Sequence, residues 1–149
     1  MNISDYLIEG SVLKNICRVC DLIKLDFSNN EETICLHIQS SLMRGFKKNR
    51  LLISSNDMFI PSKYYKRRPF KKFKWDIPGN SLFDDQLEEF KKEIANKKVQ
   101  SISLCEKDLV ILFEEDLKID VLLISLETEK ELFRIFKKGN LDSHLVVET

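Results

Sequence analysis

The clearest periodic segment of the chain follows Pro78 and Gly79 and has the apolar spacing of an amphipathic helix. Its apolar residues recur at intervals of four, three and four, at Phe83, Leu87, Phe90 and Ile94. Ser81 is placed to cap the free amides at the start, and Asp84 suits the positive end of the helix dipole. The pattern predicts one main helix over about residues 81–96.

After this helix the pattern changes to the alternation and short buried runs that are typical of β-strands. We expect strands at residues 99–104, 109–113, 117–126 and 145–147, and either a strand or a short helix at 131–138. The charged run of residues 114–116 predicts a turn.

The first half of the chain shows a similar order. One or two strands are expected at residues 17–27, a polar turn at 28–32, and further strands at 33–39 and 51–53. A short helix is expected within residues 4–14, although Gly10 and β-branched neighbours disfavour it.

The two halves also resemble each other in sequence. Residues 21–25 match 108–112, and residues 42–48 match 132–138 with five identities in seven. The matches occur in the same order, 87 and 90 positions apart, which favours an internal duplication. We therefore expect matching strand starts at Asp21 and Asp108, and matching places for Arg44 and Arg134.

These patterns predict an α+β fold of two pseudo-repeated small antiparallel sheet units, with one main amphipathic helix and a short N-terminal helix. We expect a single compact domain over residues 1–149. Its first half-repeat would cover residues 1–60 and its second residues 81–149, joined by a basic aromatic linker at 61–80.

Composition indicates a protein that folds unaided in a reducing compartment. The apolar fraction of 43% is enough for a continuous core, so the four cysteines are not needed as disulfides. No apolar run has the length of a membrane span and the N-terminus does not resemble a signal peptide, so we expect a cytoplasmic location without membrane contact. The abundance of Lys, Ile, Asn, Phe and Leu is typical of an AT-rich bacterial genome.

The net charge of zero hides an asymmetry between the two parts of the chain. Residues 1–74 hold 14 Lys and Arg against 7 Asp and Glu, whereas residues 75–149 hold 10 against 17. The two parts would attract each other or attract different partners.

No motif indicates catalysis or a cofactor. Cys17 and Cys20 have the spacing of a zinc or redox pair, and Cys35 with His37 would complete four ligands. Residues three apart in a strand point to opposite faces, however, so we interpret these cysteines as small buried hydrophobic residues and expect no metal. Without a nucleophile elbow or a glycine-rich loop, we do not expect an enzyme.

The most unusual segment is residues 61–75, where basic and aromatic residues alternate. Cations neutralise phosphates and rings stack on bases, so single-stranded nucleic acid is one possible ligand, and its candidate contacts are Arg67, Arg68, Lys71, Lys72, Lys74 and Trp75. The favoured interpretation is a structural linker. In that case Phe70, Phe73 and Trp75 would be largely buried, and the basic residues would pair with the acidic residues of the helix.

The acidic residues form the opposite surface. The candidates for contact with a partner protein are Asp84, Asp85, Glu88, Glu89, Glu114, Glu115 and Asp116. Such a surface could mask a cationic partner, as an inhibitor of a nuclease would. A solvated helix face and turn explain the same residues without any partner.

Residues 35–39 with 42–44, and residues 108–113 with 132–136, resemble small bacterial families found among the immunity proteins of polymorphic toxin systems. This resemblance implies a cytoplasmic toxin–antitoxin component that neutralises a toxin by binding it. The predicted function is therefore a non-enzymatic protein-binding module, with a nucleic-acid-binding or regulatory protein as the alternative.

Overall fold

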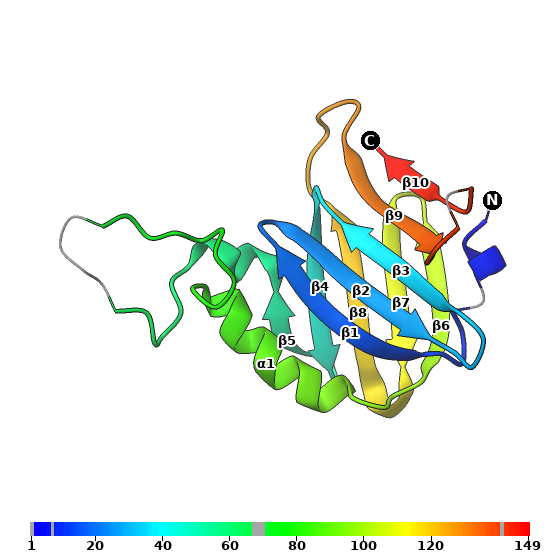
Figure 1. Ribbon diagram of the computed structural model, residues 1–149, viewed down its shortest axis with the longest axis horizontal. Helices are drawn as coiled ribbons and strands as arrows, with labels where there is room; N and C mark the ends of the chain where they lie inside the picture. The colour runs from blue at the N-terminus through cyan, green and yellow to red at the C-terminus, as the bar shows by residue number, and fades with distance from the viewer. Residues whose placement is uncertain (1, 7, 67–70, 141) are drawn as a thin grey trace.

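The computed structural model describes residues 2–6, 8–66, 71–140 and 142–149. Within these ranges ten strands form two five-stranded antiparallel sheets, which lie one in front of the other in Figure 1. The predicted fold class is confirmed, since the chain is α+β with two sheet units and one main helix. The first sheet contains, in order, β1 (Val12–Val19), β2 (Leu22–Ser28), β3 (Thr33–Ile38), β9 (Glu131–Lys137) and β10 (Leu145–Glu148).

The second sheet has the same construction with the halves exchanged. In order, it contains β5 (Arg50–Ser54), β4 (Ser41–Lys47), β8 (Leu117–Leu123), β7 (Asp108–Phe113) and β6 (Val99–Cys105). Each half of the chain thus places three consecutive strands in one sheet and its last two in the other. Sequence analysis did not predict this exchange, which makes every sheet depend on both halves.

Because each half contributes three strands to one sheet and two to the other, the two halves are related by an approximate two-fold axis. Residues that are equivalent in the two halves contact each other near this axis. The pairing registers make Val12 equivalent to Lys98 and Phe27 equivalent to Phe113. Val12 and Lys98 form a β-bridge with each other, and the rings of Phe27 and Phe113 stack with centroids 6.4 Å apart. The two phenylalanines are buried, so the core lies between the sheets.

Only one of the two expected sequence matches is structurally equivalent. Arg44 of β4 lies opposite Asp120 of β8, and Arg134 of β9 lies opposite His37 of β3, which is the equivalent position in the other sheet. The expected match of Arg44 with Arg134 is therefore confirmed. The match of Asp21 with Asp108 is wrong by one residue, because Leu22 and Asp108 are the residues that begin their strands. Since side chains alternate between the two faces of a strand, this shift would exchange inward and outward residues.

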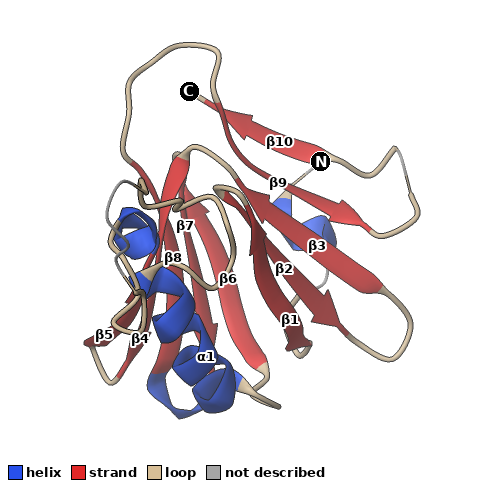
Figure 2. Cartoon of the chain, turned by 60° about the vertical axis from the view of Figure 1, so that its left-hand side comes forward, coloured by secondary structure: helices blue, strands red, loops and turns tan. Residues whose placement is uncertain are grey.

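The main helix, α1 (Leu82–Ile94), forms as the sequence predicts. Its stripe is buried at Phe83, Leu87, Phe90 and Ile94. Asp84 accepts a hydrogen bond of 2.9 Å from the Ser81 amide, half of a capping box. The helix lies against β1, β5 and the short 3₁₀ helix η2 (Ser55–Phe59), where Figures 1 and 2 show it covering one open side between the sheets.

Two sequence expectations for the first half are corrected by the structure. The N-terminal helix is only the 3₁₀ turn η1 (Ile3–Tyr6), because Gly10 adopts a φ of +82° and β1 begins at Val12. Strand β4 was not predicted, because its inward positions are Ser41, Met43 and Gly45 and two of these are not large apolar residues.

In the second half, the acidic run at residues 114–116 forms the 3₁₀ turn η3 (Glu114–Asp116), where the sequence predicts a turn.

Candidate nucleic-acid interface

The segment of alternating basic and aromatic residues forms a loop whose two ends lie side by side. Pro61 and Ser81 form a β-bridge, and the Ser62 amide donates to the Asn80 carbonyl at 2.8 Å. Leu82 donates in turn to the Ile60 carbonyl at 2.8 Å. Residues 61–81 are here called the basic aromatic loop. Its described parts, residues 61–66 and 71–81, lie to one side of both sheets in Figure 1.

Arg18 of β1 fixes the foot of this loop. Its side chain is 1% exposed, and it binds both carboxylate oxygens of Asp84, from Nε at 2.8 Å and from Nη2 at 2.7 Å. The same guanidinium donates to the carbonyl of Cys20 at 2.9 Å and to that of Ile77 at 3.1 Å. One buried side chain therefore joins β1, the N-terminus of α1 and the end of the loop.

The acid in this pair keeps its charge. Burial alone would raise the pKa of Asp84, but hydrogen bonds from Arg18 and from the Ser81 amide, together with the charge of Arg18, hold that pKa below its ordinary value. A buried charge is tolerated when it has an opposite charge beside it and its polar atoms are hydrogen-bonded. Arg18 and Asp84 both meet this condition.

The other acidic residues of α1 also have local partners. Asp85 accepts from the Ser62 hydroxyl at 2.7 Å and from the Lys63 amide at 3.1 Å. Glu88 pairs with Lys91 at 3.9 Å and Glu89 pairs with Lys92 at 3.2 Å, both within the helix. The expectation that these acids pair with the basic side chains of the loop is therefore wrong for the lysines that the structure describes, while Arg67 and Arg68 lie outside the described residues.

The acidic residues of η3 are held at the opposite end of α1. Glu115 pairs with Lys97 at 3.2 Å, and Glu114 accepts from the Lys98 amide at 3.3 Å. The carbonyl of Asp116 accepts from the Lys48 amide at 3.0 Å. The candidate acidic surface is thus divided between the two ends of the helix, and its role in binding stays a prediction.

The lysines of the basic aromatic loop face solvent. Among the described residues, all five of them are exposed and none lies within ion-pair distance of a carboxylate: Lys63, Lys66, Lys71, Lys72 and Lys74. The candidate residues Arg67 and Arg68, and Phe70, lie outside the described part of the chain. The loop therefore carries positive charge that the fold itself does not neutralise.

Three of the described aromatic side chains of the loop make edge-to-face contacts with another ring. Tyr65 and Phe73 are half-buried with ring centroids 5.2 Å apart, and Trp75 contacts Phe59 at 4.9 Å. Tyr64 is 77% exposed, and the Lys63 ammonium lies 5.5 Å from its ring centre. The expected burial is met only in part, since Phe73 and Trp75 are both half-buried, although Trp75 packs against the core.

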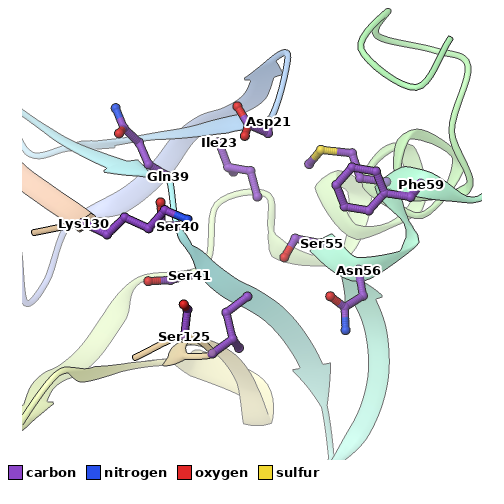
Figure 3. Close-up of a pocket in the computed structure, with 12 residues that line it drawn as sticks. Asp21, Ile23, Gln39, Ser40, Ser41, Ser55, Asn56, Phe59, Ser125 and Lys130 are labelled. Atoms are coloured by element: carbon purple, nitrogen blue, oxygen red, sulfur yellow. The ribbon is translucent and has the colours of Figure 1, made fainter. Parts of the chain in front are cut away.

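A cavity of about 230 Å³ adjoins the foot of the loop. It lies where the chain crosses between the sheets, and its walls come from the β1–β2 turn, the β3–β4 connection, η2 and the β8–β9 connection. Figure 3 shows Asp21, Gln39, Ser55, Phe59 and Lys130 around this common space. Phe59 thus belongs both to the cavity and, through Trp75, to the foot of the loop.

The cysteines do not form a site in the described chain. Cys17 is half-buried in β1, while Cys20 is exposed in the following turn with a φ of 57°. Cys35 is buried and Cys105 is exposed. The interpretation of Cys20 as a buried residue in a strand is wrong, and over the ranges that the structure covers no three His, Cys, Asp or Glu side chains are grouped as metal ligands.

Sequence reasoning missed the two residues that organise this region, Arg18 and Phe59. Arg18 could have been noticed, because it follows Ile16 at an inward position of a strand, and a charged residue there requires a buried partner. Phe59 gave no comparable signal, since its importance arises from contact with Trp75, sixteen residues further along.

No protein-family model matches this chain, and neither a search of curated proteins nor one of solved structures finds a match. Among the helices that the structure describes, none has the length and apolar character needed to cross a membrane.

Proposed function

We propose that this protein is a non-enzymatic binding protein that takes single-stranded nucleic acid on its basic aromatic loop. The observation that carries the proposal is the set of five exposed loop lysines without an acidic partner, interleaved with partly exposed aromatic rings. Cations of this kind neutralise phosphates and release counterions, while rings provide stacking surfaces for bases. The acidic residues in the first two turns of α1, which adjoin the loop, are engaged instead by Arg18, Ser62, Lys91 and Lys92.

The anchoring of the loop supports the same function. The β-bridge between Pro61 and Ser81 and the bonds of Arg18 hold both ends of the loop in place. A fixed foot lowers the entropy that is lost when a ligand orders the loop, and this loss otherwise reduces affinity.

The test is a fluorescence anisotropy titration of a labelled single-stranded oligonucleotide over a series of salt concentrations. Replacing Lys66, Lys71, Lys72 and Lys74 with Gln should weaken binding by tenfold or more and flatten the dependence on salt, because each lost phosphate contact lowers the slope by roughly 0.7. A matched control removes four exposed cations elsewhere, at Lys14, Lys48, Arg50 and Lys138. Equal effects of both variants, or no binding by the natural chain at physiological salt, would refute the proposal.

A protein partner is the second candidate, and one observation favours it. Phe59, Ile60 and Ile77 are 57%, 46% and 45% exposed beside the foot of the loop. An apolar centre with a polar rim is the usual composition of a protein interface. In the immunity function implied by the sequence resemblance, a toxin with an acidic surface would bind here.

This second candidate is tested by isolating the chain with its partners from the source cell and identifying them by mass spectrometry. A purified partner whose toxic activity is suppressed at a one-to-one ratio by the natural chain, but not by an Ile77→Ser variant, would support it. Suppression that is unaffected by the Ile77→Ser and loop-lysine variants would place the interface elsewhere.

A further inference from the structure

We infer that the cavity between Asp21 and Phe59 binds a single nucleobase that carries an exocyclic amino group, cytosine being the best fit. The inference deepens the proposed function and rests on it, because the base would belong to a strand whose phosphates lie along the basic aromatic loop. The cavity and the loop share one wall, since Phe59 contacts Trp75 and the Ser81 hydroxyl donates to the Met58 carbonyl.

The size and the walls of the cavity suit one small ring. Its volume of about 230 Å³ is below the range of about 300–1,000 Å³ that is typical of drug-sized ligands. Ile23, Met58 and Ile124 supply apolar surface, and the exposed ring of Phe59 supplies a face on which a base can stack. Figure 3 shows the Ile23 side chain and the Ser55 hydroxyl directed into the space that Phe59 closes on one side.

The polar groups at the rim can read the edge of a base. Among the residues that the structure describes, the side chains of Asp21, Gln39 and Asn56 make no hydrogen bond within the protein, since Gln39 and Asn56 are bonded through their backbone amides. An ionised carboxylate only accepts hydrogen bonds, so Asp21 would accept from the amino group of cytosine and would repel the carbonyl oxygen that uracil carries at the same position. The carboxylate of Asp21 therefore predicts a preference for cytosine over uracil.

The internal duplication provides a comparison inside the same molecule. The equivalent corner of the second half also has a cavity, of about 580 Å³, between the β6–β7 turn and the β8–β9 connection. Its lining residues are Cys105, Glu106, Lys107, Asp108, Leu123, Leu126 and Thr149, none of which is aromatic. The aromatic wall thus occurs at the corner that adjoins the basic aromatic loop, which is where a base would need it.

The test compares two ligands of equal charge, oligodeoxycytidylate and oligodeoxyuridylate of the same length, by anisotropy at neutral pH. The natural chain should prefer the cytosine strand by about tenfold. Asp21→Asn, which offers a donor and an acceptor, should remove most of this preference and leave the salt dependence unchanged. Phe59→Ala should weaken the binding of both strands by about tenfold through lost stacking, whereas Leu51→Ala, at a residue that is 51% exposed on β5, should change neither.

The outcomes separate this inference from the proposed function. If both strands bind equally well and Asp21→Asn changes nothing, the base site is refuted, while the loop-lysine variants still decide the proposed function. If no strand binds, the proposed function fails. Cytidine monophosphate, titrated by calorimetry, then decides the cavity: binding that is lost in Asp21→Asn supports the base site, and absence of binding overturns it.

Discussion

Arg18 and Asp84 are 66 positions apart in the sequence and form a two-point ion pair in which the side chains are 1% and 11% exposed. The pair connects an edge strand of one half with the first turn of the helix that opens the other half. It also supports the foot of the basic aromatic loop through the Ile77 carbonyl and the Ser81 hydroxyl. Its loss would therefore affect both stability and the loop.

Replacing Asp84 with Asn tests this connection. The substitution preserves the shape of the side chain but leaves the Arg18 guanidinium buried without an anion, so the free energy of unfolding should fall by ~3–5 kcal/mol. Urea unfolding monitored by circular dichroism gives this value. Glu89→Gln on the same helix is the matched control, because the Glu89–Lys92 pair is largely exposed and its loss should cost less than about 1 kcal/mol.

The same variant should free the loop. Limited trypsin digestion at the loop lysines should become faster in Asp84→Asn than in the natural chain under conditions where both remain folded. If digestion rates are equal and unfolding is unchanged, Arg18 has found another way to satisfy its charge and does not anchor the loop.

A second prediction concerns the close approach of α1 to β4 at Gly45. A methyl group at Gly45 would lie 2.6 Å from Ile53 Cγ2 and 2.7 Å from Phe90 Cζ, both in the core. Gly45→Ala should therefore destabilise the protein by about 1–3 kcal/mol through overpacking. The equivalent position in the other half is the buried Ile135, so the absence of a side chain at Gly45 is what admits the helix.

A double variant distinguishes overpacking from a backbone effect. Phe90→Leu alone should destabilise by leaving a cavity, but combined with Gly45→Ala it should cost less than the sum of the two, because the smaller side chain makes room for the new methyl group. Strict additivity in urea unfolding would show that the clash is relieved in some other way.

The helix and most strands were predictable because each has a local apolar period. The stripe of α1 and the alternation in β6 are visible without any tertiary information. Strand β4 was not visible, because its inward residues include Ser41 and Gly45, and the latter makes room for Phe90 from a distant helix. The match of Asp21 with Asp108 failed because identical letters do not specify which face of a strand a residue occupies.

The candidate site was predictable only in part, for a similar reason. The basic and aromatic residues at 61–75 were recognised by composition, but the absence of ion pairs between the described loop lysines and the acidic helix was not. It depends on the contacts that Asp84 makes with Arg18 and Asp85 makes with Ser62, and both require knowledge of the folded chain. The cavity beside Phe59 arises from four separate segments and had no signature in any one of them.

A third prediction concerns the reactivity of the four cysteines toward a thiol reagent such as iodoacetamide. Burial, a hydrogen bond to Asp26 and the charge of Asp26 raise the pKa of Cys35 to about 11, so its thiol should remain unreactive at neutral pH until the protein unfolds. The exposed Cys20 and Cys105 should be modified first. Mass spectrometry of the peptides would show the order, and early modification of Cys35 would contradict the burial of β3.

The last prediction concerns His37, whose ring forms a T-shaped pair with that of Phe136 on the outer face of the first sheet, with centroids 4.9 Å apart. Burial, followed by the positive charge of Lys24, lowers the pKa of His37 below its ordinary value of about 6.5, and Arg134 acts in the same direction. Asp26 and Glu131 oppose this shift without cancelling it.

The sign of the effect on stability follows from the lowered pKa. Between the ordinary value and the lower folded value, the unfolded chain binds the proton more readily, so the stability that neutral His37 contributes is present above about pH 6.5 and is lost as the pH falls through the folded pKa. Proton NMR of the ring should show a midpoint below 6.5. Lys24→Gln should raise this midpoint and Asp26→Asn should lower it, with His144→Gln used to assign the two histidine signals. If both substitutions move the midpoint in the same direction, a change in packing rather than charge controls the titration of His37.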